Sequence, residues 1–376
     1  MTGEDAEEEA RNRTAENETR DRTRTYWQSI RSQGRRAFLS TVGIAGVGAA
    51  GAYAQRPSAK SSVTGGGDGE NPTEIGSCVV IDEPGEYELV DDIERDEPGG
   101  CIVIQASDVV LRGNGHTLTG RIGIAIGPTL EDFSDPQSTE EVPEPPDPLT
   151  NVTVKDLEVR GSGVGIRTRH ISDSMLSGIT AREKSFAVQL SDATRDTVVC
   201  DCVVVDNHFG IVAGGDPFEP FFPTSVEGNT YEHNEIARNR YGISMGGESF
   251  DDVIRMNRIT DNEIGIDQSG EEGVEGHEYH DNVICRNERW GVSNWVALSV
   301  RDGGGVNILN ATDNYWGAAN GPSTGWGRPE SVADPETGRL ADGDGDAIAP
   351  GPDGLVANVR FDPFRAETID EAGPRD

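Results

Sequence analysis

The chain has 376 residues, 34% of them hydrophobic, with 48 glycines and 20 prolines. This turn-rich composition fits one or two soluble domains and argues against a helical bundle. Acids outnumber Lys and Arg by 67 to 32, which gives a net charge of −35, so no basic stripe is present to bind nucleic acid. Such a surface is tolerable in molar salt and indicates adaptation to a saline habitat; a cation-steering role is the alternative.

Residues 1–54 have the pattern of an export signal. Arg35 and Arg36 precede a Gly/Ala-rich apolar run that ends in "AYA" at Ala54. The segment resembles a twin-arginine signal, which exports folded proteins, so we expect cleavage after Ala54 and a location at the cell surface or in the medium. The protein would then contact the membrane only through this segment, before cleavage. An uncleaved segment that anchors the protein in the membrane is the alternative. The Gly/Ser-rich residues 55–74 predict a flexible linker.

A unit of about 23 residues then recurs, too short for a pair of helices and without the Leu ladder of leucine-rich repeats. Three short strands and three turns per unit fit this length, and stacking would bury one branched residue of each unit. These anchor residues are Ile124, Ile166, Val188, Ile211, Ile243, Ile266 and Val292. We predict an all-β fold, a single-stranded right-handed parallel β-helix of about 8–10 coils over residues 75–365, followed by a disordered acidic tail at 366–376.

Asparagines recur at the corners of the predicted coils. Asn tolerates tight turns, and stacked Asn side chains can bond to one another along the axis. One predicted ladder contains Asn234, Asn257 and Asn282, and a second corner is marked by Asn207, Asn239 and Asn262. Aromatic residues also recur, two positions before the anchors, and we expect them to stack inside the core. They are Phe186, Phe209, Tyr241 and Trp290.

The five cysteines accompany an export signal, which favours an oxidising compartment. Cys78 and Cys101 flank the first hairpin-like segment, and we expect a disulfide between them. Cys200 and Cys202 lie two residues apart on one predicted strand. Cys285 would lie three coils away, roughly 14 Å from Cys202 at the usual strand spacing, which is too far for a bridge. These three are interpreted as buried thiols.

The two ends of the repeat region resemble a known superfamily. "CVVIDEPGEYELV…GNGHTLTG" (Cys78–Gly120), "ATDNYWGAANGP" (Ala311–Pro322) and "VANVRFDPF" (Val356–Phe364) are similar to the opening and closing segments of parallel β-helix repeat proteins with the pectin-lyase-like fold. This form is also similar to relatives of the periplasmic copper-insertion accessory proteins of nitrous-oxide reductase. The resemblance implies the fold, while its members include lyases, hydrolases, epimerases and proteins without known chemistry.

Four excursions from the repeat leave the same predicted corner, after the strand that holds the anchor: residues 128–150, 214–225, 269–276 and 296–304. They would form a wall beside the first-strand sheet, where the resemblance implies that enzymes of this fold bind extended sugars. The residues that follow the anchors would face outward as a row: Arg167, Gln189, Val212, Ser244, Asp267 and Ser293, with Trp295 two residues further on. Our candidate ligand-binding residues are Arg167, Gln189, Asp267, Ser293 and Trp295, and an ordinary solvated face is the alternative.

Glycoside hydrolysis needs two carboxylates at a defined separation. Asp267 is the candidate catalytic residue, and Asp216 or Glu271 are candidate partners. Arg167 would lie four coils from Asp267, roughly 19 Å away, too far to cooperate with it. The pattern "DGDGD" offers Asp342, Asp344 and Asp346 as a possible calcium site, but it lacks the final Glu of a calcium loop.

These observations predict an exported, salt-adapted β-helix protein that binds extended polysaccharide or another cell-envelope glycan. A polysaccharide lyase or glycoside hydrolase acting in the first-strand groove is the alternative, and a metal-insertion accessory protein is a third possibility. No cofactor is required by the first reading, and whether the chain is catalytic stays open, with binding favoured.

Overall fold

The computed structural model describes residues 71–127, 147–214, 225–269, 274–296, 307–325, 331–350 and 358–375. The expected export signal, with Arg35, Arg36 and the cleavage point after Ala54, lies outside these ranges. Within these ranges all the secondary-structure elements are β-strands, and no helix is long and apolar enough to cross a membrane. Of the 31 strands, 26 belong to one sheet whose strands pair in parallel.

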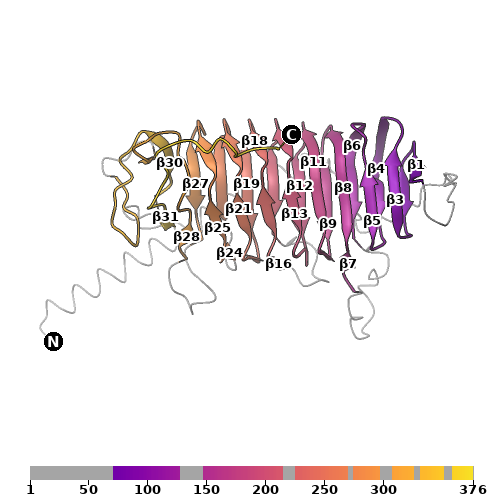
Figure 1. The fold of residues 1–376 in the computed structure, drawn as a ribbon, viewed down its shortest axis with the longest axis horizontal. Coiled ribbons are helices and arrows are strands. Elements are labelled where there is room, and N and C mark those ends of the chain that lie inside the picture. Colours follow the sequence, from indigo (N-terminus) through magenta and orange to yellow (C-terminus); the bar gives the residue numbers. More distant parts are fainter. Residues whose placement is uncertain are drawn as a thin grey trace, which may run out of the picture. The chain divides into compact units, whose positions relative to one another are not determined.

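The chain winds as a right-handed parallel β-helix, so the predicted fold class is confirmed (Figure 1). Each strand pairs with the equivalent strand of the next coil, which produces three stacks along the long axis. The first stack contains β2 (Val79–Ile81), β4 (Ile93–Ile104), β6 (Thr117–Ile126), β9 (Val164–Arg169), β12 (Phe186–Ser191), β15 (Phe209–Ala213), β19 (Tyr241–Gly246), β23 (Ile264–Ser269), β27 (Trp290–Asn294) and β30 (Gly345–Ile348).

The second stack begins before the predicted boundary at residue 75, because its first strand starts at Thr73 inside the expected linker. It contains β1 (Thr73–Ile75), β3 (Gly85–Leu89), β5 (Val109–Arg112), β8 (Val152–Arg160), β11 (Met175–Arg182), β13 (Val198–Cys200), β17 (Thr230–Glu232), β21 (Val253–Arg255), β25 (Glu278–His280), β28 (Leu309–Asn310) and β31 (Val359–Arg360).

The third stack uses parts of the long strands β4, β6, β8 and β11, which turn a corner without a break. It continues through β14 (Val203–Val205), β18 (Glu235–Ala237), β22 (Arg258–Thr260) and β26 (Val283–Cys285). Short accessory pairings complete the structure: β7 (Leu149–Thr150) with β10 (Ile171–Ser172), then β16 (Val226–Glu227), β20 (Ser249–Phe250) and β24 (Val274–Glu275) with one another, and β29 (Pro322–Thr324) with β30.

The predicted anchors form one buried column inside the first stack. Ile124 pairs with Ile166, and the register continues without a slip to Val292. All seven anchors are fully buried. Each branched side chain packs on its neighbour one coil away, and full burial of such a side chain contributes roughly 1.5–3 kcal/mol. The repeat therefore encodes the core directly.

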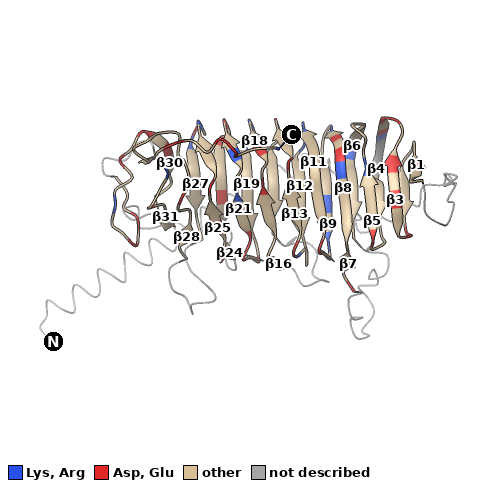
Figure 2. Ribbon diagram, in the orientation of Figure 1, with Lys and Arg blue, Asp and Glu red and all other residues tan. Residues whose placement is uncertain are grey.

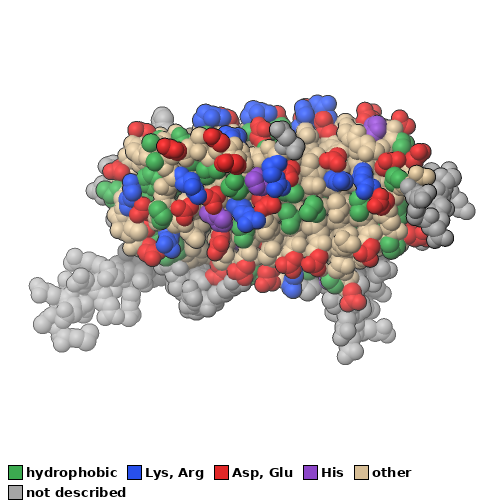
Figure 3. Space-filling model, in the orientation of Figure 1, with side chains coloured by type: hydrophobic (Ala, Val, Ile, Leu, Met, Phe, Trp, Pro, Cys, Tyr) green, Lys and Arg blue, Asp and Glu red, His purple; other side chains and the backbone are tan. Residues whose placement is uncertain are grey.

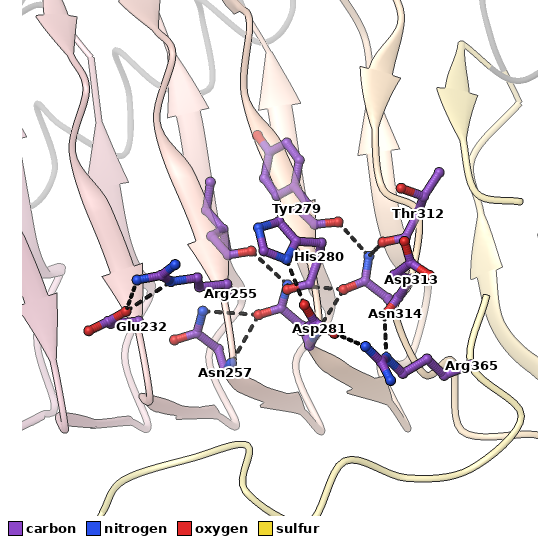
Figure 4. A network of polar contacts seen from close by, with 12 residues as sticks. Glu232, Arg255, Asn257, Tyr279, His280, Asp281, Thr312, Asp313, Asn314 and Arg365 are labelled. Carbon is purple, nitrogen blue, oxygen red and sulfur yellow. Dashed lines mark hydrogen bonds and ion pairs between the residues drawn. The ribbon is translucent and has the colours of Figure 1, made fainter. Parts of the chain in front are cut away.

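The asparagine ladders are present at two corners. In the first, the backbone N–H and Nδ2 of Asn234 both donate to Oδ1 of Asn257 (3.0 Å each), and Asn257 donates in the same way to Asn282. Asn282 then donates to Asn314, which Figure 4 labels at this corner together with Asn257. The second ladder runs through Asn207, Asn239, Asn262 and Asn287. These side chains are buried, as a structural role requires.

The expected inward aromatic stack is wrong, because these rings lie on the outside of the first stack. Phe186, Phe209 and Tyr241 stack on one another with centroids 4.8–5.0 Å apart, and each is half-buried. The residue after each ring is a buried Gly or Ala, so two consecutive positions face inward and the alternation fails. A Cβ on Gly242 would lie 2.5 Å from a backbone oxygen of the next coil, so the chain passes too close there for any side chain.

Cys78 and Cys101 are joined by a disulfide, the pairing expected from the sequence. Cys200 and Cys202 do not share a strand, because Asp201 between them turns the corner with a φ of 54°. Cys202 then occupies a ladder position, where its backbone N–H donates to Asn234. Cys285 is half-buried and is a free thiol, as is each of the other two.

The segment expected to be a disordered tail is instead folded onto the β-helix. Arg365 pairs with Asp281, and Arg375 forms a bidentate ion pair with Asp201 (2.7 and 2.8 Å). Between these two points Ile369 and Ala372 are buried against the third stack, in one cluster with Val283, Met256, Cys285 and Tyr315. The segment therefore runs back along several coils, and Figure 4 shows Arg365 meeting Asp281 at its start.

Candidate functional site

The predicted outward row exists as one column on the first stack. Arg167 pairs in register with Gln189, and the same register continues through Val212, Ser244, Asp267 and Ser293. β9, β12, β19 and β27 follow one another along the long axis in Figure 1. Because strands lie about 4.8 Å apart, equivalent side chains of successive coils are spaced by that distance.

The excursions begin at one corner, as predicted. The strands that precede them are β6, β15, β23 and β27, which all belong to the first stack. Most of residues 128–150, 214–225, 269–276 and 296–304 lie outside the described ranges, and so do Asp216 and Glu271. The wall proposed from the sequence, and either candidate partner of Asp267 in it, therefore stay predictions.

Asp267 and Ser293 differ from the other members of the row because they are covered. Asp267 is 7% exposed and Ser293 is 0% exposed, while Arg167, Gln189, Val212 and Ser244 are partly exposed. The expectation that both would be exposed is wrong, and their role in ligand binding stays a prediction. They point away from the core, but another part of the chain lies above them.

Two indoles lie on either side of this covered position. Trp290 and Trp295 occupy the outward positions of β27 and of its end, before and after Ser293, and their rings meet edge to face at 5.4 Å. The guanidinium of Arg289 lies 4.0 Å from the centre of the Trp290 ring, in cation–π range. We call Trp290 and Trp295 the indole pair. Trp290 was assigned to the core from its sequence position, so its part in this site was missed.

Burial raises the pKa of Asp267, while hydrogen bonds from Ser293 and Ser269 favour its anion. The Ser293 hydroxyl donates to its Oδ1 at 2.6 Å. Among the described residues no second carboxylate contacts Asp267, and Arg167 lies four strands away along the stack, roughly 19 Å by the strand spacing. Within the described part of the chain this geometry supplies one buried acid. The acid pair that glycoside hydrolysis requires would need Asp216 or Glu271, which lie outside that part.

The "DGDGD" segment does not gather its three acids. Asp346 lies at the acceptor end of the second asparagine ladder, where its Oδ2 accepts from the backbone N–H and Nδ2 of Asn287 at 3.0 and 2.7 Å. Burial raises its pKa to about 6. Asp344 accepts from Asn320 instead, and Asp342 is exposed. Across the described ranges no three His, Cys, Asp or Glu side chains are grouped to hold a metal ion.

A buried Ser–His–Asp constellation, not anticipated from the sequence, lies at a third corner. His277 Nε2 is 3.1 Å from the Ser249 hydroxyl, and its Nδ1 is 3.6 Å from Oδ2 of Asp252. The backbone N–H of Asp252 donates to Nδ1 at 3.1 Å, so in neutral His277 the proton must sit on Nε2. Nε2 then donates to Ser249 and cannot take its proton. All three side chains are buried, so this constellation is structural and not a nucleophilic triad.

No family model matches this sequence, and no curated protein matches it. Solved structures do match in fold at low similarity. The tailspike protein 2 enzymatically active domain of Bacteriophage CBA120 is 13% identical over 73% of this chain and 46% of its own, with a TM-score of 0.37. This chain therefore spans about half of that tailspike domain's length.

Two epimerases are similar to a comparable degree. A mutant of the periplasmic alginate epimerase AlgG is 14% identical over 74% of this chain and 77% of its own, with a TM-score of 0.37. The A-module of the Azotobacter vinelandii mannuronan C-5 epimerase AlgE4 is 14% identical over 76% of this chain and 88% of its own, with a TM-score of 0.35. Likenesses at these TM-scores say nothing about the activity of this chain.

Proposed function

We propose that this chain is an exported, salt-adapted β-helix protein of the cell surface or medium that binds an extended polysaccharide along the outward row. The observation that carries the proposal is the row itself: a column that is polar except at Val212, in strict register over successive coils, with the indole pair at one end. A linear polymer repeats its own groups along its length. A face that repeats donors and acceptors at a fixed interval is suited to such a ligand.

The exposed members of the row provide the contacts. Arg167 carries a guanidinium, Gln189 an amide and Ser244 a hydroxyl, and all three side chains are partly exposed. Sugar hydroxyl groups donate and accept hydrogen bonds, so this set can bind them without charge pairing. The half-exposed rings of Phe186, Phe209 and Tyr241 run beside the row, but they stack face on face and so offer only their edges.

Export and salt adaptation are supported by the sequence. Arg35 and Arg36 precede an apolar run that ends at a small-x-small sequence, and the disulfide between Cys78 and Cys101 fits an oxidising compartment. The net charge of −35 fits a saline one.

Affinity chromatography on neutral and acidic polysaccharides in molar salt tests the proposal. Retention without turnover is the expected result, and Gln189→Ala should weaken it because that variant removes an exposed amide from the row. Glu278→Gln is the matched control, since Glu278 is exposed on β25 of the second stack. Equal retention of both variants would show that the row does not bind the polymer.

A polysaccharide lyase or glycoside hydrolase is the alternative, and one observation favours it. Asp267 is a buried acid whose raised pKa is the property of a general acid. If the protein releases new reducing or unsaturated ends from a polysaccharide, Asp267→Asn should abolish that turnover. A variant with the parent rate would discard Asp267 as the acid, and a parent protein without turnover would discard the alternative.

A further inference from the structure

The outward row is open at one end and closed at the other. Toward the N-terminal coils it continues through Ala125 on β6 and Val103 on β4, both partly exposed and both with small or medium-sized side chains. Toward the C-terminal coils it ends in Asp267 and Ser293, which are covered although the register is unbroken. The change from exposed to covered falls between β19 and β23.

Several residues that contact one another lie at the closed end of the row. Trp290 and Trp295 contact each other across the position of Ser293, and Arg289 packs on the face of Trp290. Gly325 packs against Trp290 as well, since a Cβ there would lie 2.6 Å from its Nε1. Ser293, which lies between the two indoles in the sequence, donates a hydrogen bond to Asp267. The indole pair is therefore held by contacts from several directions.

From these observations we infer that the row binds the end of a linear glycan, with the terminal sugar next to the indole pair and the rest of the chain extending toward β6. The inference rests on the proposed glycan function. A ligand that passes along the whole first stack would have to cross the indole pair, whereas a chain end that stops there meets no obstacle among the described residues. The open stretch from Arg167 on β9 to Ser244 on β19 spans three strand spacings, about 14 Å.

Trp295 and Asp267 have different parts in this arrangement. Trp295 is partly exposed at the closed end of the row, so it can contact the terminal sugar directly. Asp267 is a positioning residue, because its carboxyl lies under the cover and contacts Ser293. Replacing Asp267 by Asn should therefore change glycan affinity much less than replacing Trp295 by Ala.

The number of binding sites per gram of polymer tests end binding with the unmodified protein. Linear neutral and acidic polysaccharides, a β-1,4-glucan and a polyuronate, are cut to several average lengths and titrated in molar salt. End binding predicts that shortening the chains tenfold raises the amount of protein bound per gram about tenfold. A bound amount that does not depend on chain length would overturn the inference while leaving glycan binding intact. No binding to any polymer would instead remove the glycan function itself, and end binding with it.

Variants of the indole pair provide a second test. Trp295→Ala should lower the affinity for a short oligosaccharide at least several-fold, whereas the distant Glu278→Gln should stay near the parent value. Thermal melting of each variant shows whether it is folded before its affinity is interpreted. If Trp295→Ala is folded and binds like the parent, the closed end is not where the terminal sugar lies.

Discussion

At each rung of a ladder, a buried asparagine both accepts and donates hydrogen bonds. In Asn257, Oδ1 accepts from the rung before it, and Nδ2 donates both to the rung after it and to the backbone oxygen of Tyr231. The side-chain amide offers a donor and an acceptor in the same small plane. A ladder in which each rung donates to the next rung on its C-terminal side must end on an acceptor, and the carboxylate of Asp346 serves this purpose after Asn287.

Asp252 is an acid at such a rung, and its environment predicts a pH-dependent stability. Its Oδ1 accepts from the backbone N–H and Nδ2 of Asn229, while burial raises its pKa to about 7 from 3.8. Between these two pH values the folded protein holds a proton on Asp252 that the unfolded chain releases. Stability from this group is therefore present at low pH and is lost as the pH rises to about 7.

Asp252→Asn should remove that loss, because an amide keeps the acceptor for Asn229 and carries no buried charge. The variant should be more stable than the parent above pH 7, by an amount on the order of a few kcal/mol for such a shift. The difference should shrink toward pH 4. Thermal melting across this range measures it, and Asp251→Asn, at the exposed neighbouring position, is the control. A constant difference between variant and parent would contradict the assigned pKa.

Ile266→Asn tests the inward column of anchors. Ile266 is fully buried between Ile243 and Val292, so the substitution removes apolar packing and places an amide where the neighbouring side chains provide no partner. The free energy of unfolding should fall by several kcal/mol. Ser244→Asn, on the outward face one coil away, should cost little. Unaltered denaturant unfolding of the Ile266 variant would mean that this column does not form the core.

The anchors could be predicted from the sequence because a one-residue period error would bury polar groups in every coil. The aromatic row could not, because the two consecutive inward positions arise from the close approach of Gly242 to the next coil. The burial of Asp267 and the meeting of Trp290 and Trp295 could not be predicted either, because both arise from contacts in space that have no sequence period.

At the scale of elements, the C-terminal segment 366–375 shows how a polar stretch becomes ordered through distant partners. Its acids, Gly373 and Pro374 are typical of disorder, which is why a tail was predicted. Its partners Asp281 and Asp201 lie 84 and 174 residues earlier than the arginines that bind them. No local pattern contains that information. The segment shields an apolar part of the third stack that includes Val283.

Deleting residues 366–376 should expose that part of the third stack. Cys285 is half-buried beside Ile369 and Ala372, and burial raises the pKa of its thiol. Without the segment the thiol should ionise more readily and react with iodoacetamide several-fold faster at pH 8. Peptide mapping identifies the modified cysteine. Arg375→Ala should give a smaller increase in the reaction rate, because the ion pair between Arg365 and Asp281 still holds the segment. An unchanged rate in the deletion variant would show that the segment does not cover Cys285.

At the scale of the whole molecule, arginines are matched to acids from coil to coil. Arg238 pairs with Asp206, Arg255 with Glu232 and Arg286 with Asp261, each across neighbouring coils. Both signs are interspersed along the strands and on the visible face (Figures 2 and 3). Such exposed pairs contribute little individually. The stacked architecture was predictable because each coil contacts only its neighbours, so the repeating unit in the sequence describes how all the coils pack.

The segments that interrupt the repeat are richer in acids than the rest of the chain. Residues 128–150 contain seven acids, residues 214–225 two, residues 269–276 three and residues 296–304 one, against a single arginine, Arg301. All four segments leave the first stack at the same corner. Their acidic composition adds to the repulsion between like charges in the chain as a whole. This repulsion is long-ranged in dilute buffer and is screened within about 3 Å in 1 M salt, compared with about 10 Å at 0.1 M.

Stability should therefore fall as salt is removed. Screening also weakens the attractive pairs, but 67 acids face only 32 bases, so repulsion is the larger effect in the net balance. The melting temperature should decrease steadily from molar to about 0.1 M sodium chloride, and the loss should be greatest below 0.5 M, where the screening length grows fastest. Sucrose at low salt is the control, because it favours compact states by exclusion from the surface and screens no charge. Full recovery in sucrose alone, or a melting temperature that rises on desalting, would show that charge repulsion does not set the salt requirement.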